Sequence, residues 1–140
     1  MVKVSLEYKG DLRCEARHEP SSSTLNTDAP VDIQGKGEAF SPTDLVGTAL
    51  GTCMATTMAM SGKRHQVPDI AGLRIDVTKE MTSEGPRKIR RLSTEMWIPL
   101  PKSADPEGVL EHAALNCPVY LSLDPGIEKP FTVHWQKEQN

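Results

Sequence analysis

Three cysteines, at positions 14, 53 and 117, are the residues of this sequence with the clearest chemical potential. Cys53 lies in SPTDLVGTALGTCMATTMAM (residues 41–60), a run of mostly small and apolar residues, and Cys117 directly precedes Pro118. Three widely spaced cysteines do not form the disulfide framework of a small secreted domain. In a reducing compartment, cysteines that form disulfides tend to be catalytic or redox-sensing. The residues alone leave two interpretations open: a reactive pair, or two small buried core side chains.

The two cysteines differ in how a thiolate could be stabilised. Cys117 precedes a proline at an expected helix start, where free backbone N–H groups and the helix dipole favour the thiolate. Cys53 is expected three turns inside its helix, where no free N–H group is at hand. A reactive Cys53 therefore needs a positive charge from elsewhere, and Arg13 and Arg17 on an early strand are the candidates.

Other chemistries find little support in the sequence. Cys14 and His18 are expected in one strand, where four residues span about 13 Å, too far to share a tetrahedral ion. There is no CxxC motif, no GxSxG nucleophile elbow and no phosphate-binding glycine loop. The sequence therefore predicts a protein without a metal site and without a cofactor.

Composition limits the partners and the location. A net charge of −3 argues against a nucleic-acid surface, and the basic run RKIRR (residues 87–91) fits a solvated strand face. No apolar stretch approaches the roughly 20 residues of a membrane span, and the N-terminus lacks a signal-peptide core, so a cytoplasmic protein is expected. Aromatic residues make up only 4% of the sequence. Such a thin core favours an oligomer.

Several elements follow from local patterns. Apolar residues alternate over residues 2–8 and again over residues 12–16, which predicts a hairpin of half-buried strands. Ser41, Pro42 and Asp44 form a helix start with a capping box. The helix is expected to run to about Met60 and, lacking charges after Asp44, to be buried on nearly all sides.

The second half of the sequence alternates strands and short helices. Strands are expected over residues 72–80 and 87–100, a helix over residues 105–115, a further helical turn after Pro118, and a closing strand in KPFTVHWQK (residues 129–137). This order predicts an α+β fold with antiparallel strand pairing in a single domain over residues 1–140.

Taken together, these motifs resemble the OsmC/Ohr family of thiol-dependent organic hydroperoxide reductases. The resemblance is carried by GDLR in the hairpin, GKGEAFSPTDL before the helix, ALGTCM within it, and CPV at the second helix start. It implies antiparallel sheets wrapped around a buried central helix in an intertwined homodimer, with the active sites at the dimer interface. It also implies an organic hydroperoxide as substrate and a small dithiol, of lipoyl type in one branch, as reductant.

The resemblance further implies roles for individual residues. Cys53 would attack the peroxide and become a sulfenic acid, and Cys117 would condense with it to a disulfide. Arg13, which follows the Gly10-Asp11 turn, matches the family arginine that stabilises the thiolate better than Arg17 does.

One departure from the family pattern concerns the acid that holds this arginine. The family glutamate lies ten residues before the first cysteine, where this sequence has Thr43, and the nearest acid is Asp44. Nine helical residues place Asp44 on the face opposite Cys53 and roughly 13 Å away along the axis. Asp44 could serve the partner's site, Glu38 could take the role, or Asp44 could be only a helix cap.

Two functions from different classes are compatible with these features. The first is a cysteine-based peroxidase in a homodimer. The second is a scaffold of the same fold that binds a small apolar ligand, or a regulatory partner, without turnover.

Overall fold

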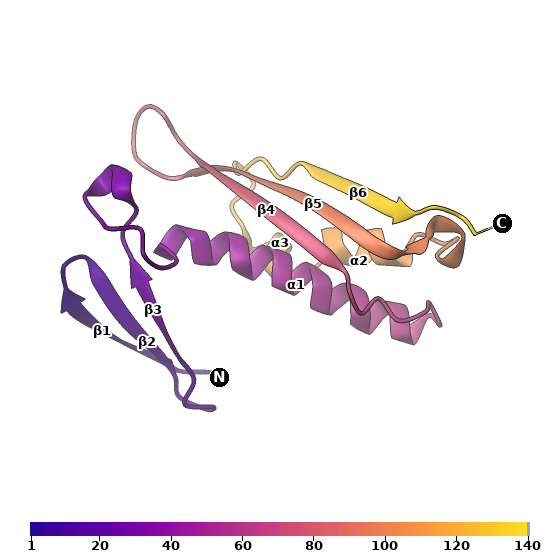
Figure 1. Ribbon diagram of the computed structural model, residues 1–140, viewed down its shortest axis with the longest axis horizontal. Coiled ribbons are helices and arrows are strands. Elements are labelled where there is room, and N and C mark those ends of the chain that lie inside the picture. Colours follow the sequence, from indigo (N-terminus) through magenta and orange to yellow (C-terminus); the bar gives the residue numbers. More distant parts are fainter. Residues whose placement is uncertain (140) are drawn as a thin grey trace. The chain divides into compact units, whose positions relative to one another are not determined.

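Two three-stranded sheets and one long helix make up most of the computed structural model, which describes residues 1–139 (Figure 1). The strands are β1 (Val4–Gly10), β2 (Arg13–His18), β3 (Thr24–Asp28), β4 (Arg74–Met81), β5 (Ile89–Pro101) and β6 (Phe131–Gln136). The α-helices are α1 (Pro42–Arg64), α2 (Val109–Leu115) and α3 (Pro118–Ser122), with single 3₁₀ turns at Val31–Ile33 and Lys102–Ala104. The predicted α+β class is confirmed.

The chain divides into an N-terminal unit, from Met1 to Val46, and a C-terminal unit, from Gly47 onward. In the N-terminal unit, β1, β2 and β3 form an antiparallel sheet, and the predicted hairpin is present as β1 and β2. The alternation of side chains is as predicted, but the expected half-burial is not. Leu6 is 71% exposed, and Val4 and Tyr8 are exposed on the same face of the sheet.

The C-terminal unit contains the second sheet, in the order β4-β5-β6. Strands β4 and β5 are antiparallel, whereas β5 and β6 are parallel. The expectation of purely antiparallel pairing is therefore wrong for β6. Between β5 and β6 the chain passes through α2 and α3, and a crossover of this length returns the chain in the same direction.

Helix α1 begins at the predicted capping box. The backbone N–H of Ser41 donates to Asp44 Oδ2 at 2.9 Å, and the Asp44 N–H donates to Ser41 Oγ at 3.1 Å. Pro42 occupies the first helical position, where its missing N–H costs nothing. The helix extends to Arg64, one turn beyond the predicted end at Met60. Lys63 and Arg64 in the last turn favour this extension, because cations interact well with the negative end of the helix dipole.

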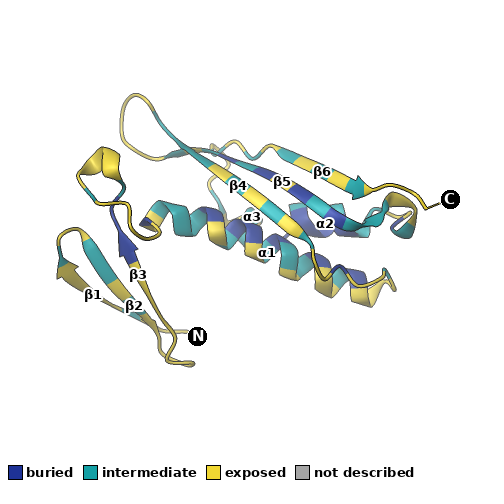
Figure 2. Cartoon of the chain, in the orientation of Figure 1, coloured by how far each residue is buried: buried dark blue, intermediate teal, exposed yellow. Residues whose placement is uncertain are grey.

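One side of α1 packs in the C-terminal unit (Figure 2). The buried positions are Gly47, Leu50, Gly51, Met54, Met58 and Gly62. A Cβ at Gly51 would lie 3.0 Å from Val77 Cγ2 of β4, so glycine allows the helix backbone to approach the sheet closely. The opposite side, with Thr48, Thr52 and Thr56, is exposed. Within a single chain, the expectation of burial on nearly all sides is therefore wrong.

The helices after β5 are fixed by a buried carboxylate. Asp105 is buried, and its two oxygens accept hydrogen bonds from the backbone N–H groups of Val109 and Leu110, each at 2.9 Å. These bonds satisfy two of the free donors at the start of α2. The predicted helix over residues 105–115 thus exists from Val109, with Gly108 at the N-cap position and the Asp105 carboxylate bonded to its first N–H groups. The next helix, α3, begins at Pro118 as predicted.

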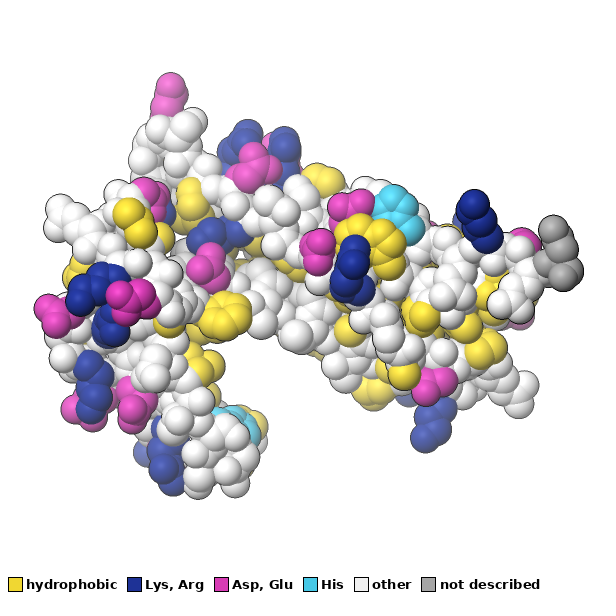
Figure 3. All heavy atoms as spheres, in the orientation of Figure 1, with side chains coloured by type: hydrophobic (Ala, Val, Ile, Leu, Met, Phe, Trp, Pro, Cys, Tyr) yellow, Lys and Arg dark blue, Asp and Glu magenta, His cyan; other side chains and the backbone are white. Residues whose placement is uncertain are grey.

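Charges of both signs are interspersed on the face shown in Figure 3. The basic run at residues 87–91 follows this pattern, since Arg90 and Arg91 pair with Glu80, and Arg91 also pairs with Glu128 at 2.6 Å. Among the described residues, no helix combines the length and apolar character that crossing a membrane requires.

Candidate functional site

Cys53 and Cys117 lie side by side in the C-terminal unit. Cys53 is on α1 and partly buried, and Cys117 is the fully buried residue that caps the N-terminus of α3. The two thiols form a side-chain hydrogen bond with each other, and all three cysteines of the chain are free. The structure therefore brings together the two cysteines that the sequence placed 64 residues apart (117 − 53).

The surroundings of Cys117 favour its protonated form. Burial raises the pKa of the Cys117 thiol, and the hydrogen bond and negative charge of Cys53 raise it further. The backbone N–H of Tyr120, which donates to Cys117 Sγ at 3.4 Å, acts in the opposite direction. The expectation that the helix start favours a Cys117 thiolate is therefore wrong: the N–H contact is present, but desolvation outweighs it.

Arg13 lies in the N-terminal unit, at the start of β2, between two carboxylates. Its Nη2 is 2.6 Å from Glu38 Oε2 and 3.4 Å from Asp28 Oδ2. The Glu38 hydrogen bond is the main cause that raises the pKa of Arg13. Of the acids considered from sequence, Glu38 contacts Arg13, and Asp44 is seen capping its own helix.

Asp28 is a residue of this cluster that sequence reasoning did not identify. Its signal in the sequence is faint: a single acid at the end of a short strand, whose pairing register with the arginine strand cannot be read from local patterns. In the structure Asp28 is buried and lies directly opposite Arg13 in the sheet.

The remaining candidates make local contacts. Arg17 donates to Ser22 Oγ at 2.9 Å and pairs with Glu19, and the His18 ring contacts Ser21 Oγ at 2.6 Å. Cys14 lies opposite Tyr8 and Thr27 in the first sheet. Among residues 1–139, no three His, Cys, Asp or Glu side chains gather in a way that could hold a metal ion.

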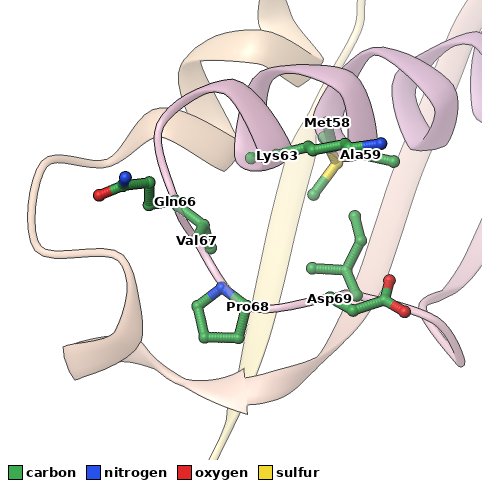
Figure 4. A pocket seen from close by; sticks show the side chains of 9 residues that line it. Met58, Ala59, Lys63, Gln66, Val67, Pro68 and Asp69 are labelled. Atoms are coloured by element: carbon green, nitrogen blue, oxygen red, sulfur yellow. The ribbon is translucent and has the colours of Figure 1, made fainter.

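A pocket of about 530 Å³ lies beside the last turns of α1 (Figure 4). Its apolar walls come from Met58, Val67, Pro68 and Ile70, and Lys63, Gln66 and Asp69 supply polar groups. Neither Cys53 nor Cys117 lines this pocket. The thiol pair and the pocket are therefore separate features of the C-terminal unit.

Comparison with known proteins identifies the family. The model of the OsmC-like protein family matches residues 35–129, which include both Cys53 and Cys117. No protein of curated function matches the sequence significantly.

Solved structures agree with this match over nearly the whole chain. A Psychrobacter arcticus protein, named for osmotic stress and detoxification responses, is 38% identical, with a TM-score of 0.86 and 96% of each chain covered. An OsmC-like protein of Mycoplasma pneumoniae is 15% identical, with a TM-score of 0.78 and 96% of each chain covered. An organic hydroperoxide resistance protein of Elizabethkingia anophelis is 13% identical, with a TM-score of 0.78, covering 97% of this chain and 96% of that one. The last two similarities concern the fold alone. With the family model matching residues 35–129, the chain belongs to the OsmC-like protein family.

Proposed function

We propose that the protein is a thiol-dependent peroxidase that reduces organic hydroperoxides to alcohols. The observation that carries the proposal is the contact between Cys53 and Cys117, because two thiols in hydrogen-bonding contact can form a disulfide with little movement. Membership of a family that includes organic hydroperoxide resistance proteins supports the choice of substrate.

The reaction begins at Cys53. Its thiolate attacks the terminal oxygen of the hydroperoxide, the O–O bond breaks, and the alkoxide leaves and takes up a proton to become the alcohol. Cys53 is then a sulfenic acid. The Cys117 sulfur attacks the Cys53 sulfur, the S–O bond breaks, and the hydroxyl leaves with the Cys117 proton as water. The product is the Cys53–Cys117 disulfide.

A small dithiol completes the cycle. One of its thiolates attacks the disulfide, and its second thiol displaces the mixed disulfide, so the protein regains both thiols and the reductant becomes a cyclic disulfide. A lipoyl-type dithiol suits this step because its two thiols are on one molecule. The chemistry uses no metal and no bound cofactor.

In this proposal Arg13 stabilises the Cys53 thiolate and orients the peroxide. Two acids contact Arg13 in the absence of the family glutamate, which Thr43 replaces: Glu38 at 2.6 Å and Asp28 at 3.4 Å. Asp44 acts as the cap of α1, and the hydrogen bonds with Ser41 support this role. A direct part for Asp44 in the chemistry stays a prediction, and it would require the site of a second chain.

The functional assembly in this proposal is a homodimer. The apolar residues Val4, Leu6 and Tyr8 share one face of the first sheet and are all exposed in a single chain. The side of α1 that carries Thr52 and Thr56 is exposed too. A second copy would cover such surfaces, which single chains rarely leave open to solvent. Active sites at the dimer interface, as the family resemblance implies, fit this arrangement.

The decisive experiment is stoichiometric oxidation. The reduced protein is treated with one equivalent of tert-butyl hydroperoxide or of hydrogen peroxide, and its free thiols and intact mass are measured. Organic peroxide should remove two thiols per chain and form the Cys53–Cys117 disulfide, and dihydrolipoamide should restore them. Cys53→Ser should abolish oxidation, whereas the matched variant Cys14→Ser should react like the wild type.

The alternative function, binding of a small apolar ligand without turnover, predicts that the thiols are not oxidised. If all three thiols stay free under stoichiometric organic hydroperoxide, the peroxidase proposal fails. The pocket beside the last turns of α1 would then be the first place to look for a small apolar ligand.

A further inference from the structure

Arg13 and Asp28 face each other across two strands of the N-terminal unit. They are direct partners in the register of β2 and β3, and Arg13 Nη2 lies 3.4 Å from Asp28 Oδ2. The Asp28 side chain is 1% exposed, whereas that of Glu38, the second acid on Arg13, is 61% exposed. A buried carboxylate must be compensated by hydrogen bonds or opposite charge, and for Asp28 the charge of Arg13 supplies part of this compensation beside backbone N–H groups.

Asp28 also holds the loop that carries Glu38. The Glu38 backbone N–H donates to Asp28 Oδ2 at 3.0 Å, and the Asp28 N–H donates to the carbonyl of Phe40 at 3.1 Å. The hydrogen bond from Glu38 and the charge of Arg13 lower the pKa of Asp28, in that order, against its burial. One ionised side chain thus connects the arginine to the loop that leads into α1.

The turn before Arg13 is strained, and the same region restrains it. Gly10, Asp11 and Leu12 have consecutive positive φ angles of 88°, 52° and 61°. A leucine in this conformation is unfavourable and persists only where its surroundings impose it. Here the Ala29 N–H, directly after Asp28, donates to the carbonyl of Leu12 at 3.2 Å. Leu12, which precedes Arg13, is therefore hydrogen-bonded to Ala29, which follows Asp28.

The ion pair has an unused donor and an unused acceptor. Arg13 Nε and Asp28 Oδ1 are both buried and have no hydrogen-bond partner. Together with the existing Nη2–Oδ2 contact, they are the atoms that a two-bond pair between a guanidinium and a carboxylate would use. Asp28 can thus hold Arg13 through two hydrogen bonds, whereas the contact with Glu38 lies in solvent.

We propose that Asp28, rather than Glu38, is the residue that positions Arg13 for the reaction at Cys53. This inference rests on the proposed peroxidase function. Asp28 contacts neither substrate nor thiol in this scheme; it acts through the arginine. The exposed Glu38 adds a contact that solvent screens.

The test compares two carboxylates on the same guanidinium. The rate of disulfide formation with tert-butyl hydroperoxide is measured for wild type, Asp28→Asn and Glu38→Gln. Asp28→Asn should lower the rate at least about tenfold, because a displaced arginine no longer meets the reacting groups. Glu38→Gln should lower it no more than about threefold, as for an exposed pair. A larger effect of Glu38→Gln would assign the role to Glu38.

A double-mutant cycle separates positioning from mere folding. In an Arg13→Lys background, Asp28→Asn should have little further effect on the rate, since the group through which it acts is already gone. A second loss as large as the first would make Asp28 a structural residue and overturn the inference.

A readout without activity keeps the inference distinct from the proposed function. In NMR spectra, the Arg13 Nε–H proton should exchange with solvent faster in Asp28→Asn than in wild type or Glu38→Gln. If the wild type is not oxidised at all, the proposed function fails, while this exchange still tests the positioning. If Asp28→Asn does not fold, the Arg13 Nε–H signal of the wild type is followed over a pH series instead. This signal should change as Asp28 titrates. A signal that changes only as Glu38 titrates contradicts the inference.

Discussion

At the scale of single residues, the proposed reaction gives the two thiols unequal tasks. Cys117 is fully buried, and burial together with Cys53 raises its pKa, so at neutral pH it is a protonated thiol. This suits a resolving residue, which must wait until Cys53 has reacted. In the proposed reaction, a protonated Cys117 also avoids placing a second negative charge beside the attacking sulfur of Cys53.

The pH dependence of Cys117 should depend on Cys53. Cys53→Ala removes the hydrogen bond and the negative charge that raise the pKa of Cys117, so the titration of Cys117 should move to lower pH. The shift is measured from the Cys117 ¹³Cβ signal over a pH series. Cys14→Ala is the control and should leave the titration in place, since Cys14 is not among the groups that shift this pKa. An unmoved titration in Cys53→Ala would show that the two thiols do not interact.

Removing Cys117 should stop the reaction at its first intermediate. In Cys117→Ser the Cys53 sulfenic acid has no thiol to condense with, so it should persist and be trapped by dimedone as a single adduct in the intact mass. Turnover with a dithiol should fall at least about tenfold, because the disulfide step is lost. A disulfide that still forms in this variant would point to Cys14 as the partner and contradict the assigned role.

At the scale of elements, glycines set how closely α1 lies on the second sheet. A Cβ at Gly51 would lie 3.0 Å from Val77 Cγ2, whereas a Cβ at Gly47 would lie at an ordinary 3.5 Å from Val77. Gly51 is two residues from Cys53 and belongs to the same buried stripe as Met54. The distance between α1 and the second sheet therefore helps to set the position of Cys53.

The two glycines form a matched pair for a stability experiment. Gly47→Ala and Gly51→Ala gain the same helix propensity, up to about 1 kcal/mol, but only Gly51→Ala forces Val77 to move. Gly51→Ala should therefore be less stable than Gly47→Ala by about 1 kcal/mol or more in urea unfolding. Equal stabilities would mean that the sheet yields to the added methyl group at no cost.

At the scale of the whole molecule, the single chain leaves apolar surface open. Leu6 and Tyr8 on β1 are exposed, and Leu25 on β3 is exposed next to Ala16 of β2. A sheet with one apolar face is stable only when that face is covered. The proposed homodimer supplies the cover.

The oligomeric state should respond to charge on this face. Leu6→Asp should leave a single chain folded, since Leu6 is already exposed, but it should weaken a dimer that buries Leu6. Light scattering during size-exclusion chromatography measures the mass across a dilution series. Glu7→Gln is the control: Glu7 points to the opposite face of the sheet, so this variant should have the same mass as the wild type at each concentration. A wild type that is monomeric at every concentration would rule the dimer out.

Much of this protein follows from the sequence by itself. The alternation of β1 and β2, the capping box of Ser41 and Asp44, and the helix start at Pro118 depend on neighbouring residues, so local rules predict them. The cysteine motifs indicated the family, which the family model and the solved structures confirm.

Only the tertiary structure decided the rest. The parallel pairing of β6, the contact of Cys53 with Cys117 and the register that sets Asp28 opposite Arg13 join residues far apart in the chain. No local pattern encodes such pairings, because they depend on which surfaces pack together. The state of the Cys117 thiol depends on packing as well. A helix start favours the thiolate, but burial, which only the folded chain defines, favours the thiol more strongly.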